Sequence, residues 1–280
     1  MSIEKILQNE CHKRSLTLNN FCYSRPSTRG SVNAYEILAQ GPTNSSVLFV
    51  HGFGNDSLFP QIPFLLKLAE EGHTVFTFDL DGHGIHSTTL LIPDEMLSSI
   101  KDAVLQIKER GFTGKLHLIG HSLGALLSLH ASVRDELALS SLTLISMATD
   151  MRFTRSVLLR EAFSSIFTGS FFRILKFYKT DFIPALGPIG RSRFPIRTEK
   201  KRDESVRDLV RFLKHLMRNP VYARVRTLYC YGTRDILTPL QEDKLRISES
   251  DTLLMLKGET HLTTISSSLL SQEVCKWLEK

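Results

Sequence analysis

The chain has 280 residues, of which 42% are hydrophobic and 23% charged, and its formal net charge is +6 at pH 7. This balance is that of a globular protein with a substantial core, and it excludes a disordered, collagenous or coiled-coil chain. No run reaches the roughly 18 apolar residues of a membrane-spanning helix, and Met1 to Arg14 shows no secretion signal. We therefore expect a soluble intracellular protein.

In chain order, short β-rich apolar runs alternate with amphipathic stretches. Strands are expected at residues 21–24, 32–39, 47–50, 74–78, 115–119, 141–146, 225–231 and 252–256. Helices are expected at 58–71, 93–110, 123–133, after Pro239, and at the C-terminus as far as about Trp277. The helix after Pro239 is favoured by three local signals. Thr238 can serve as the N-cap, Pro239 suits the first turn, and Gln241 can complete a capping box.

The alternation is interrupted between residues 150 and 220, which hold no strand-like run and are predicted to be helical. Strand–helix alternation implies an α/β fold with a mostly parallel sheet and helices on both faces. We therefore expect a core formed by residues 1–149 and 221–280, with residues 150–220 inserted as a helical cap after the sixth strand. Ligands of such sheets bind at the carboxyl ends of the strands, the side from which this cap emerges.

The sequence Gly120-His121-Ser122-Leu123-Gly124 is a G-x-S-x-G motif between a predicted strand and a predicted helix. In that context the motif is typical of a nucleophile elbow. A turn tight enough to present Ser122 clear of the backbone needs glycines at its flanks, and the helix N-terminus favours developing negative charge. Ser122 is therefore the predicted nucleophile.

With this motif the sequence resembles the α/β-hydrolase family, and further stretches match the family in order. Residues 51–54 (HGFG) are similar to its oxyanion loop, and residues 79–84 (DLDGHG) are similar to its D-x-x-G-x-G turn. Residues 232–235 (GTRD) stand where the family keeps its catalytic acid, and His261 stands where it keeps its base. The resemblance covers about residues 20–148 and 221–280, and it implies the α/β-hydrolase fold.

The resemblance also implies roles for individual residues. His261 would take the proton of the Ser122 hydroxyl, and Asp235 would hold the tautomer of His261 and stabilise its imidazolium form. Backbone N–H groups of Phe53 and Leu123 would meet the oxyanion. Asp150 also follows a predicted strand and is an alternative acid, although the turn around Asp235 matches the family better.

Several histidines surround these motifs. His121 is expected to pack or position, because its side chain points away from that of Ser122. His51 is expected to brace the oxyanion loop. Together with His83 and His86 it could suggest a metal site, but no H-x-x-x-H spacing or carboxylate partner supports one. We expect no metal and no cofactor.

One loop departs from the family pattern, which usually runs D-x-x-G-x-G-x-S. Here Ile85 and His86 separate Gly84 from Ser87, so there is one residue more than the pattern allows. Asp79, the first residue of the motif, is expected to fix the turn and not to react. The extra residue affects the path of this loop and not the predicted triad.

The four cysteines are widely scattered along the chain, at positions Cys11, Cys22, Cys230 and Cys275. They contain no C-x-x-C pair, and no histidine lies at a spacing suited to zinc. A chain of this length needs no disulfides, so we expect four reduced thiols.

The predicted cap is strongly basic, with 16 Lys and Arg against 6 Asp and Glu between Met151 and Pro220. It contains two apolar stripes with helical spacing, formed by Phe171, Ile174, Leu175 and Tyr178 and by Leu209, Phe212, Leu213, Leu216 and Met217. Either both stripes pack on the core, or they form a lid whose basic, aromatic face meets an acyl chain or an anionic surface. In the second case the substrate pocket would include Phe171, Ile174, Leu175, Phe212 and Leu216.

Serine at the elbow indicates acyl transfer to water, since dehalogenases and epoxide hydrolases of this family use Asp there. The helical cap looks like that of the monoacylglycerol lipase and lysophospholipase branch, so we expect hydrolysis of a lipid-like or medium-chain carboxylic ester. A short-chain carboxylesterase or a thioesterase is the close alternative, and a non-catalytic binding module of the same fold is an alternative of another class. We expect a cytoplasmic protein with peripheral contact to anionic membrane through the cap, and no nucleic-acid partner, because no such motif accompanies the charge.

Overall fold

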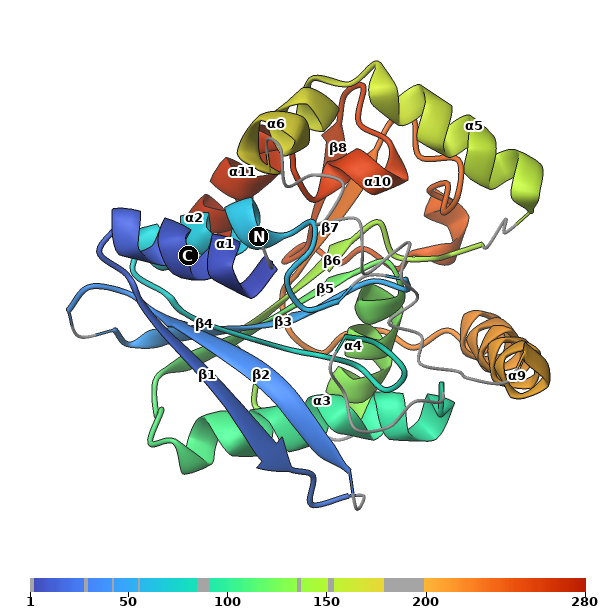
Figure 1. Cartoon of the computed structure of the whole chain (residues 1–280). Coiled ribbons are helices and arrows are strands. Elements are labelled where there is room, and N and C mark those ends of the chain that lie inside the picture. The colour runs from blue at the N-terminus through green and yellow to red at the C-terminus, as the bar shows by residue number, and fades with distance from the viewer. Residues whose placement is uncertain are drawn as a thin grey trace.

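A computed structural model describes residues 3–27, 30–41, 43–54, 56–84, 91–134, 137–150, 154–178 and 199–280. Its eight strands form one sheet in the order β1-β2-β4-β3-β5-β6-β7-β8 (Figure 1). The strands are β1 (Thr17–Ser24), β2 (Ser31–Leu38), β3 (Ser45–Val50), β4 (Thr74–Phe78), β5 (Lys115–His121), β6 (Ser141–Ile145), β7 (Thr227–Gly232) and β8 (Thr252–Leu256). The pairs β1–β2 and β2–β4 are antiparallel and the other pairs are parallel, so the predicted mostly parallel sheet is confirmed.

Helices cover both faces of the sheet. The described helices are α1 (Ile3–Lys13), α2 (Ile62–Glu70), α3 (Pro93–Glu109), α4 (Leu123–Arg134), α5 (Arg155–Ile166), α6 (Gly169–Tyr178), α9 (Glu199–Arg218), α10 (His261–Thr264) and α11 (Ser268–Glu279), with a short 3-10 helix, η2 (Glu242–Lys244). Figure 1 shows α1, α2 and α11 on one face and α3 and α4 on the other. Helices α5, α6 and α9 lie between β6 and β7 in the chain, which confirms a helical insertion after the sixth strand. Within the described parts of the chain, no helix is both long enough and apolar enough to cross a bilayer.

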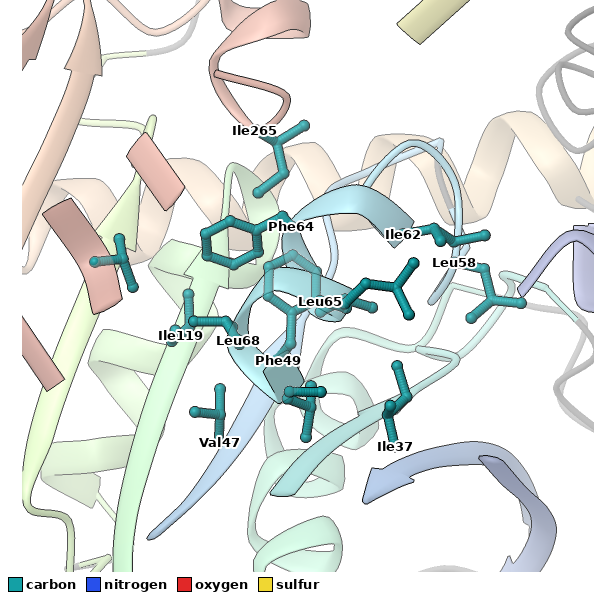
Figure 2. Packing of buried hydrophobic residues seen from close by; sticks show 14 of the residues in the cluster. Ile37, Val47, Phe49, Leu58, Ile62, Phe64, Leu65, Leu68, Ile119 and Ile265 are labelled. Carbon is teal, nitrogen blue, oxygen red and sulfur yellow. The ribbon is translucent and has the colours of Figure 1, made fainter. Parts of the chain in front are cut away.

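The central strands β3, β4, β5 and β6 are buried along nearly their whole length because both faces of the sheet are covered. On the α2 face, Phe64 and Leu65 pack over Phe49 of β3, and all three side chains are buried (Figure 2). Complete burial of one such side chain contributes about 1.5–3 kcal/mol. Ile265, directly after α10, joins the same cluster beside Phe64. The core thereby fixes the segment that begins with His261.

The prediction of an α-helix after Pro239 is wrong, because the structure has only the short 3-10 helix η2 there. The predicted cap residue does not serve a helix. The Thr238 hydroxyl donates instead to Asp235 Oδ2 and lies within hydrogen-bond distance of the Ser146 carbonyl oxygen. The carbonyl of Pro239 accepts a hydrogen bond from Thr149. A hydrogen bond within the loop to Asp235, together with long-range contacts to Ser146 and Thr149, therefore replaces the helix capping that the sequence suggests.

Candidate active site

Ser122 occupies a strained turn between β5 and α4. Its φ of 54° lies in the left-handed region, which costs a residue with a side chain of the order of 1–3 kcal/mol. A Cβ atom on Gly120 would lie 2.4 Å from the Gly124 carbonyl oxygen, and one on Gly124 would lie 2.2 Å from the Val50 carbonyl oxygen. No side chain fits at either position, so the two glycines allow the turn that presents Ser122.

The structure brings Ser122, His261 and Asp235 together from three separate segments. His261 Nε2 lies 2.8 Å from Ser122 Oγ, and His261 Nδ1 lies 2.9 Å from Asp235 Oδ2. All three side chains are buried. A proton on Nδ1 that is donated to the carboxylate leaves the Nε2 lone pair free to accept the serine proton. The arrangement can therefore perform the first step of acyl transfer.

Asp235 is held by its own loop as well as by His261. Its Oδ1 accepts the backbone N–H groups of Leu237 and Thr238 at 3.0 and 2.8 Å, and its Oδ2 accepts the Thr238 hydroxyl at 2.9 Å. The alternative acid, Asp150, accepts a hydrogen bond from Gln241. Sequence reasoning missed this role of Thr238, although a Thr three residues after an Asp that follows a strand is a recognisable turn pattern.

The charges in this group stabilise one another. Burial acts to raise the pKa of Asp235, but the charge of His261 and hydrogen bonds from His261 and Thr238 outweigh it and keep that pKa below its usual value. Burial acts to lower the pKa of His261, but Asp235, and more weakly Glu161, raise it above its usual value. The ring of His121 lies 5.6 Å from that of His261, and burial together with the charge of His261 lowers the pKa of His121 to about 3. His121 therefore stays neutral while His261 can be protonated.

Two buried histidines brace the loop after β3. His51 donates from Nδ1 to the Gly52 carbonyl and accepts at Nε2 the N–H of Leu80, at 2.8 and 3.0 Å. His83 donates from Nδ1 to the carbonyl two residues before it, and accepts at Nε2 the N–H of Gly54. Burial, and then the neighbouring His51, lowers the pKa of His83 to about 3, so this ring remains neutral. His86 lies outside the described residues, and no group of three possible metal ligands occurs among those that are described.

The two residues predicted to form the oxyanion hole each line a cavity that also reaches Ser122. Phe53 lines both cavities that reach Ser122, and its ring meets that of His83 edge-on. Leu123 is the first residue of α4. The first amide N–H groups of a helix have no acceptor within the helix and can bind an anion.

Two cavities meet at Ser122 and Phe53. The first, here called the α6 cavity, has a volume of about 190 Å³ and is lined by Gly52, Phe53, Phe59, Pro60, His121, Ser122, Ala162, Ser165, Phe171, Ile174, His261, Leu262 and Thr263. The second, here called the α9 cavity, has a volume of about 130 Å³ and is lined by Phe53, Ser122, Leu123, Leu126, Ala148, Val206, Leu209, Val210, Leu213 and Thr238. Among the described residues that line the α9 cavity, only Ser122 and Thr238 have polar side chains. The site therefore offers two largely apolar compartments, one on either side of the serine.

The residues predicted to line the substrate pocket are only partly found at these cavities. Phe171 and Ile174 line the α6 cavity. Leu175 and Phe212 line neither cavity among the described residues, and Leu216 lines a separate cavity at the other end of α4. The helical register explains the difference on α9. Its side chains at the α9 cavity are spaced i, i+3, i+4 and i+7 and are Val206, Leu209, Val210 and Leu213.

Comparison with known proteins shows the family to which the chain belongs. The sequence profile of the Alpha/beta hydrolase family matches residues 47–269. The chain belongs to this family. It is similar to a protein of Variovorax paradoxus (strain S110) named as a candidate carbamate hydrolase, RutD, with 33% identity over 113 residues. That match spans 40% of this chain and 41% of the relative.

Solved structures share the fold of this family member. The esterase Pf2001 of Pyrococcus furiosus has a TM-score of 0.62 at 14% identity, covering 96% of this chain and 94% of that one. A thermophilic esterase from Thermogutta terrifontis has a TM-score of 0.59 at 17% identity, covering 93% of this chain and 98% of that one. At such low identity the likeness extends to the fold alone.

Proposed function

We propose that this hydrolase cleaves carboxylic esters through an acyl-enzyme formed on Ser122. The observation that carries the proposal is the hydrogen-bond chain from Ser122 Oγ through His261 to Asp235, with distances of 2.8 and 2.9 Å. This chain lies where two apolar cavities meet. Nucleophile, base and orienting carboxylate are thus within reach of one another and of a bound ester.

The reaction follows from the geometry. Ser122 Oγ attacks the ester carbonyl carbon while its proton passes to His261 Nε2. As the tetrahedral intermediate collapses, the bond to the leaving oxygen breaks and Nε2 returns the proton to the departing alcohol. Water then attacks the acyl-enzyme by the same route, which releases the carboxylic acid and restores the serine. Asp235 stabilises the imidazolium in both halves of the reaction.

Backbone N–H groups of Phe53 and Leu123 are the proposed donors to the oxyanion. Two features support this assignment: the bracing of the 52–54 loop by His51 and His83, and the position of Leu123 at the start of α4. Loss of one donor of this kind typically costs on the order of 10²–10³ in turnover. Side-chain substitution does not remove these donors, because they belong to the main chain.

The size of the cavities supports a medium-chain ester. An apolar protein cavity of about 150 Å³ accepts benzene, a molecule of six carbon atoms. The α9 cavity has about 130 Å³ and the α6 cavity about 190 Å³. We therefore propose an acyl group of about four to eight carbons, with the insertion (residues 150–220) acting as a cap on the core (1–149 and 221–280) and supplying much of the pocket wall.

The first experiment is labelling of the purified protein with a fluorophosphonate beside Ser122→Ala, followed by hydrolysis of p-nitrophenyl esters of increasing acyl length. We expect labelling that disappears in the variant, and a maximum of kcat/KM between butyrate and octanoate. A steady fall in kcat/KM from acetate upward would instead indicate a short-chain carboxylesterase. Absence of labelling in the wild type would favour a non-catalytic binding module.

The scissile bond is tested in the same assay. Thioesters and carbamates belong in the panel because the same triad can attack their carbonyl carbons, and because RutD is named for carbamate hydrolysis. Our proposal expects the oxygen ester to have the highest kcat/KM at equal acyl length. If kcat/KM is higher for the thioester or the carbamate, the proposed oxygen-ester substrate is wrong, and Ser122 remains the proposed nucleophile.

Contact with a lipid surface through the cap is a second proposal, supported by the exposed side of α5 and α6. Large apolar side chains lie exposed there, namely Leu159, Phe163, Phe167 and Phe172. Exposed Arg160 and Lys176 add positive charge beside them. An exposed apolar group with basic neighbours suits an anionic lipid surface. Equal binding to neutral and to anionic vesicles at low salt would contradict the proposal.

We also propose that the protein acts in the reducing cytoplasm. All four cysteines are free thiols, and three of them are buried. In such a compartment they would stay reduced. Fractionation of cells that express the tagged protein would check this location.

A further inference from the structure

Glu161 is a buried carboxyl group in the cap that the proposed mechanism does not use. It lies on α5, and its side chain is screened from solvent. Burial of a carboxylate is costly unless hydrogen bonds compensate for the lost water. Its position therefore requires partners, and those partners belong to the core.

The two oxygens of Glu161 bind two different segments of the triad. Oε2 accepts the backbone N–H of Ile236 and Oε1 accepts the backbone N–H of Leu262, both at 3.3 Å. Ile236 directly follows Asp235, and Leu262 directly follows His261. One carboxylate thus joins the segment of the acid to the segment of the base.

Neighbouring residues of the cap reinforce the contact with the histidine segment. Ser165, one turn after Glu161, lies with its hydroxyl 2.7 Å from that of Thr260. Ser170 donates a hydrogen bond to Glu259, and Arg173 Nε donates to the carbonyl of Ser266 at 3.3 Å. Helices α5 and α6 are therefore docked on the residues around His261 by polar contacts that are largely buried.

We propose that Glu161 is a positioning residue of the triad: by holding the N–H groups of Ile236 and Leu262, it sets the separation of Asp235 and His261. This inference rests on the proposed function of the triad. It means that α5, through Glu161, positions the catalytic residues and does not merely cover them. Errors of about 1 Å in such positioning can cost on the order of 10²-fold in rate.

The charge of Glu161 provides a second way to test this role, through the pKa of His261. Among the described residues, the ionisable groups that face His261 are Asp235 from the loop after β7, Glu161 from α5, and the neutral His121 from β5. Both carboxylates raise the pKa of His261. Loss of the Glu161 charge should therefore lower the pKa of His261, and a role confined to anchoring α5 would not.

The test compares wild type with Glu161→Gln, which keeps the shape of the side chain, and with Glu161→Ala. Active sites are counted by fluorophosphonate titration, so that unfolded protein does not enter kcat. In Glu161→Ala we expect kcat per site to fall by roughly 10- to 100-fold, with KM changed much less. In Glu161→Gln, ¹⁵N NMR of the histidines should show a lower pKa of His261 than in wild type.

Arg173→Met is the matched control, because Arg173 also docks the cap on this segment but touches neither Ile236 nor Leu262. Its kcat and its His261 titration should match wild type. The inference is overturned if both Glu161 variants keep the wild-type kcat per site and His261 titration, or if Arg173→Met loses as much kcat as Glu161→Ala. A wild type that neither labels nor hydrolyses any ester refutes the proposed function separately, and the NMR titration still decides whether Glu161 acts on His261.

Discussion

The hydroxyl of Thr238 is shared among several atoms around the triad. It donates to Asp235 Oδ2 and lies 2.9 Å from His261 Nδ1 and 3.1 Å from the Ser146 carbonyl oxygen. A hydroxyl in this position limits the directions in which the carboxylate and the imidazole can move. Its effect is separate from that of the two backbone N–H groups on Asp235 Oδ1.

Substitution Thr238→Val replaces this hydroxyl by a methyl group of similar shape. We expect kcat to fall about tenfold with little change in KM, and the free energy of unfolding to fall by about 1–2 kcal/mol because buried polar atoms lose a partner. Thr149→Val is the control, since Thr149 donates to the Pro239 carbonyl and does not contact the triad. Equal losses of kcat in the two variants would show that the Thr238 hydroxyl does not position the triad.

The dependence of activity on pH follows from the pKa of His261. The base must be neutral to accept the serine proton, and its pKa lies above the usual 6.5. We therefore expect kcat/KM to rise with pH through an apparent pKa above 6.5, measured between pH 5 and 9. Asp235→Asn removes the main cause of the shift, and in another serine hydrolase the same change costs about 10⁴ in kcat. A wild-type pH profile in that variant would argue against Asp235 as the partner of His261.

Sequence reasoning finds those site residues whose signals are local. Ser122 lies in a motif of five residues, and Asp235 and His261 each lie in the loop after a predicted strand, so the ends of parallel strands bring them to one edge of the sheet. Glu161 has no local motif, because its partners lie 75 and 101 residues away. Its one signal is that it is the only acidic residue between Met151 and Thr180, a basic stretch.

Helix α9 shows how one element forms a wall of the site and also packs on the core. Leu209 and Leu213 are buried and face the α9 cavity, while exposed Lys214 lies on the outer side of the helix. The same helix joins the hydrophobic cluster that contains α3 and α4. Because α9 is anchored in this way, the width of the α9 cavity depends on the side chains along one stripe.

A larger side chain on that stripe should shorten the acceptable acyl chain. Val210→Phe adds an aromatic ring to a cavity of about 130 Å³, so we expect kcat/KM for octanoate esters to fall at least about tenfold while acetate esters are hydrolysed as before. The control Lys214→Phe places the same ring on the outer side of the helix. An unchanged chain-length profile in Val210→Phe would mean that the acyl group does not enter this cavity.

Elements with a strong local period could be predicted, and elements set by distant contacts could not. Most of the expected strands lie within a residue or two of their observed ends. Helix α1 is not among the predicted elements, although its buried residues Ile3, Ile6, Leu7 and Cys11 have helical spacing. The prediction of a helix after Pro239 is wrong although its local capping signal is strong, because the Thr238 hydroxyl donates to Asp235 and does not cap a helix.

At the scale of the whole molecule, buried neutral histidines make the free energy of unfolding depend on pH. Burial is the main cause that lowers the pKa of five of them, to about 3 for His83 and His121, to about 4 for His117 and His130, and below its usual value for His73. The unfolded chain has histidines with a pKa near 6.5. Between these values the unfolded chain binds protons that the folded chain does not, so a fall in pH favours unfolding. His261 acts in the opposite sense, because its raised pKa adds stability that is lost as pH rises.

We therefore expect the free energy of unfolding, measured with urea, to fall steeply from pH 6.5 to 4.5. Each buried histidine contributes at most about 1.4 kcal/mol per pH unit, and the five histidines with a lowered pKa outweigh the opposite effect of His261, Asp81 and Glu161, whose pKa values are raised in the folded chain. His130→Gln should flatten the slope by up to that amount, because His130 contacts no triad residue and its ring is the titrating group removed. His12→Gln, at an exposed position of α1, should keep the wild-type slope. If His130→Gln also keeps the wild-type slope of the unfolding free energy against pH, then His130 takes up its proton in the folded chain. Acid unfolding must then come from the other buried groups.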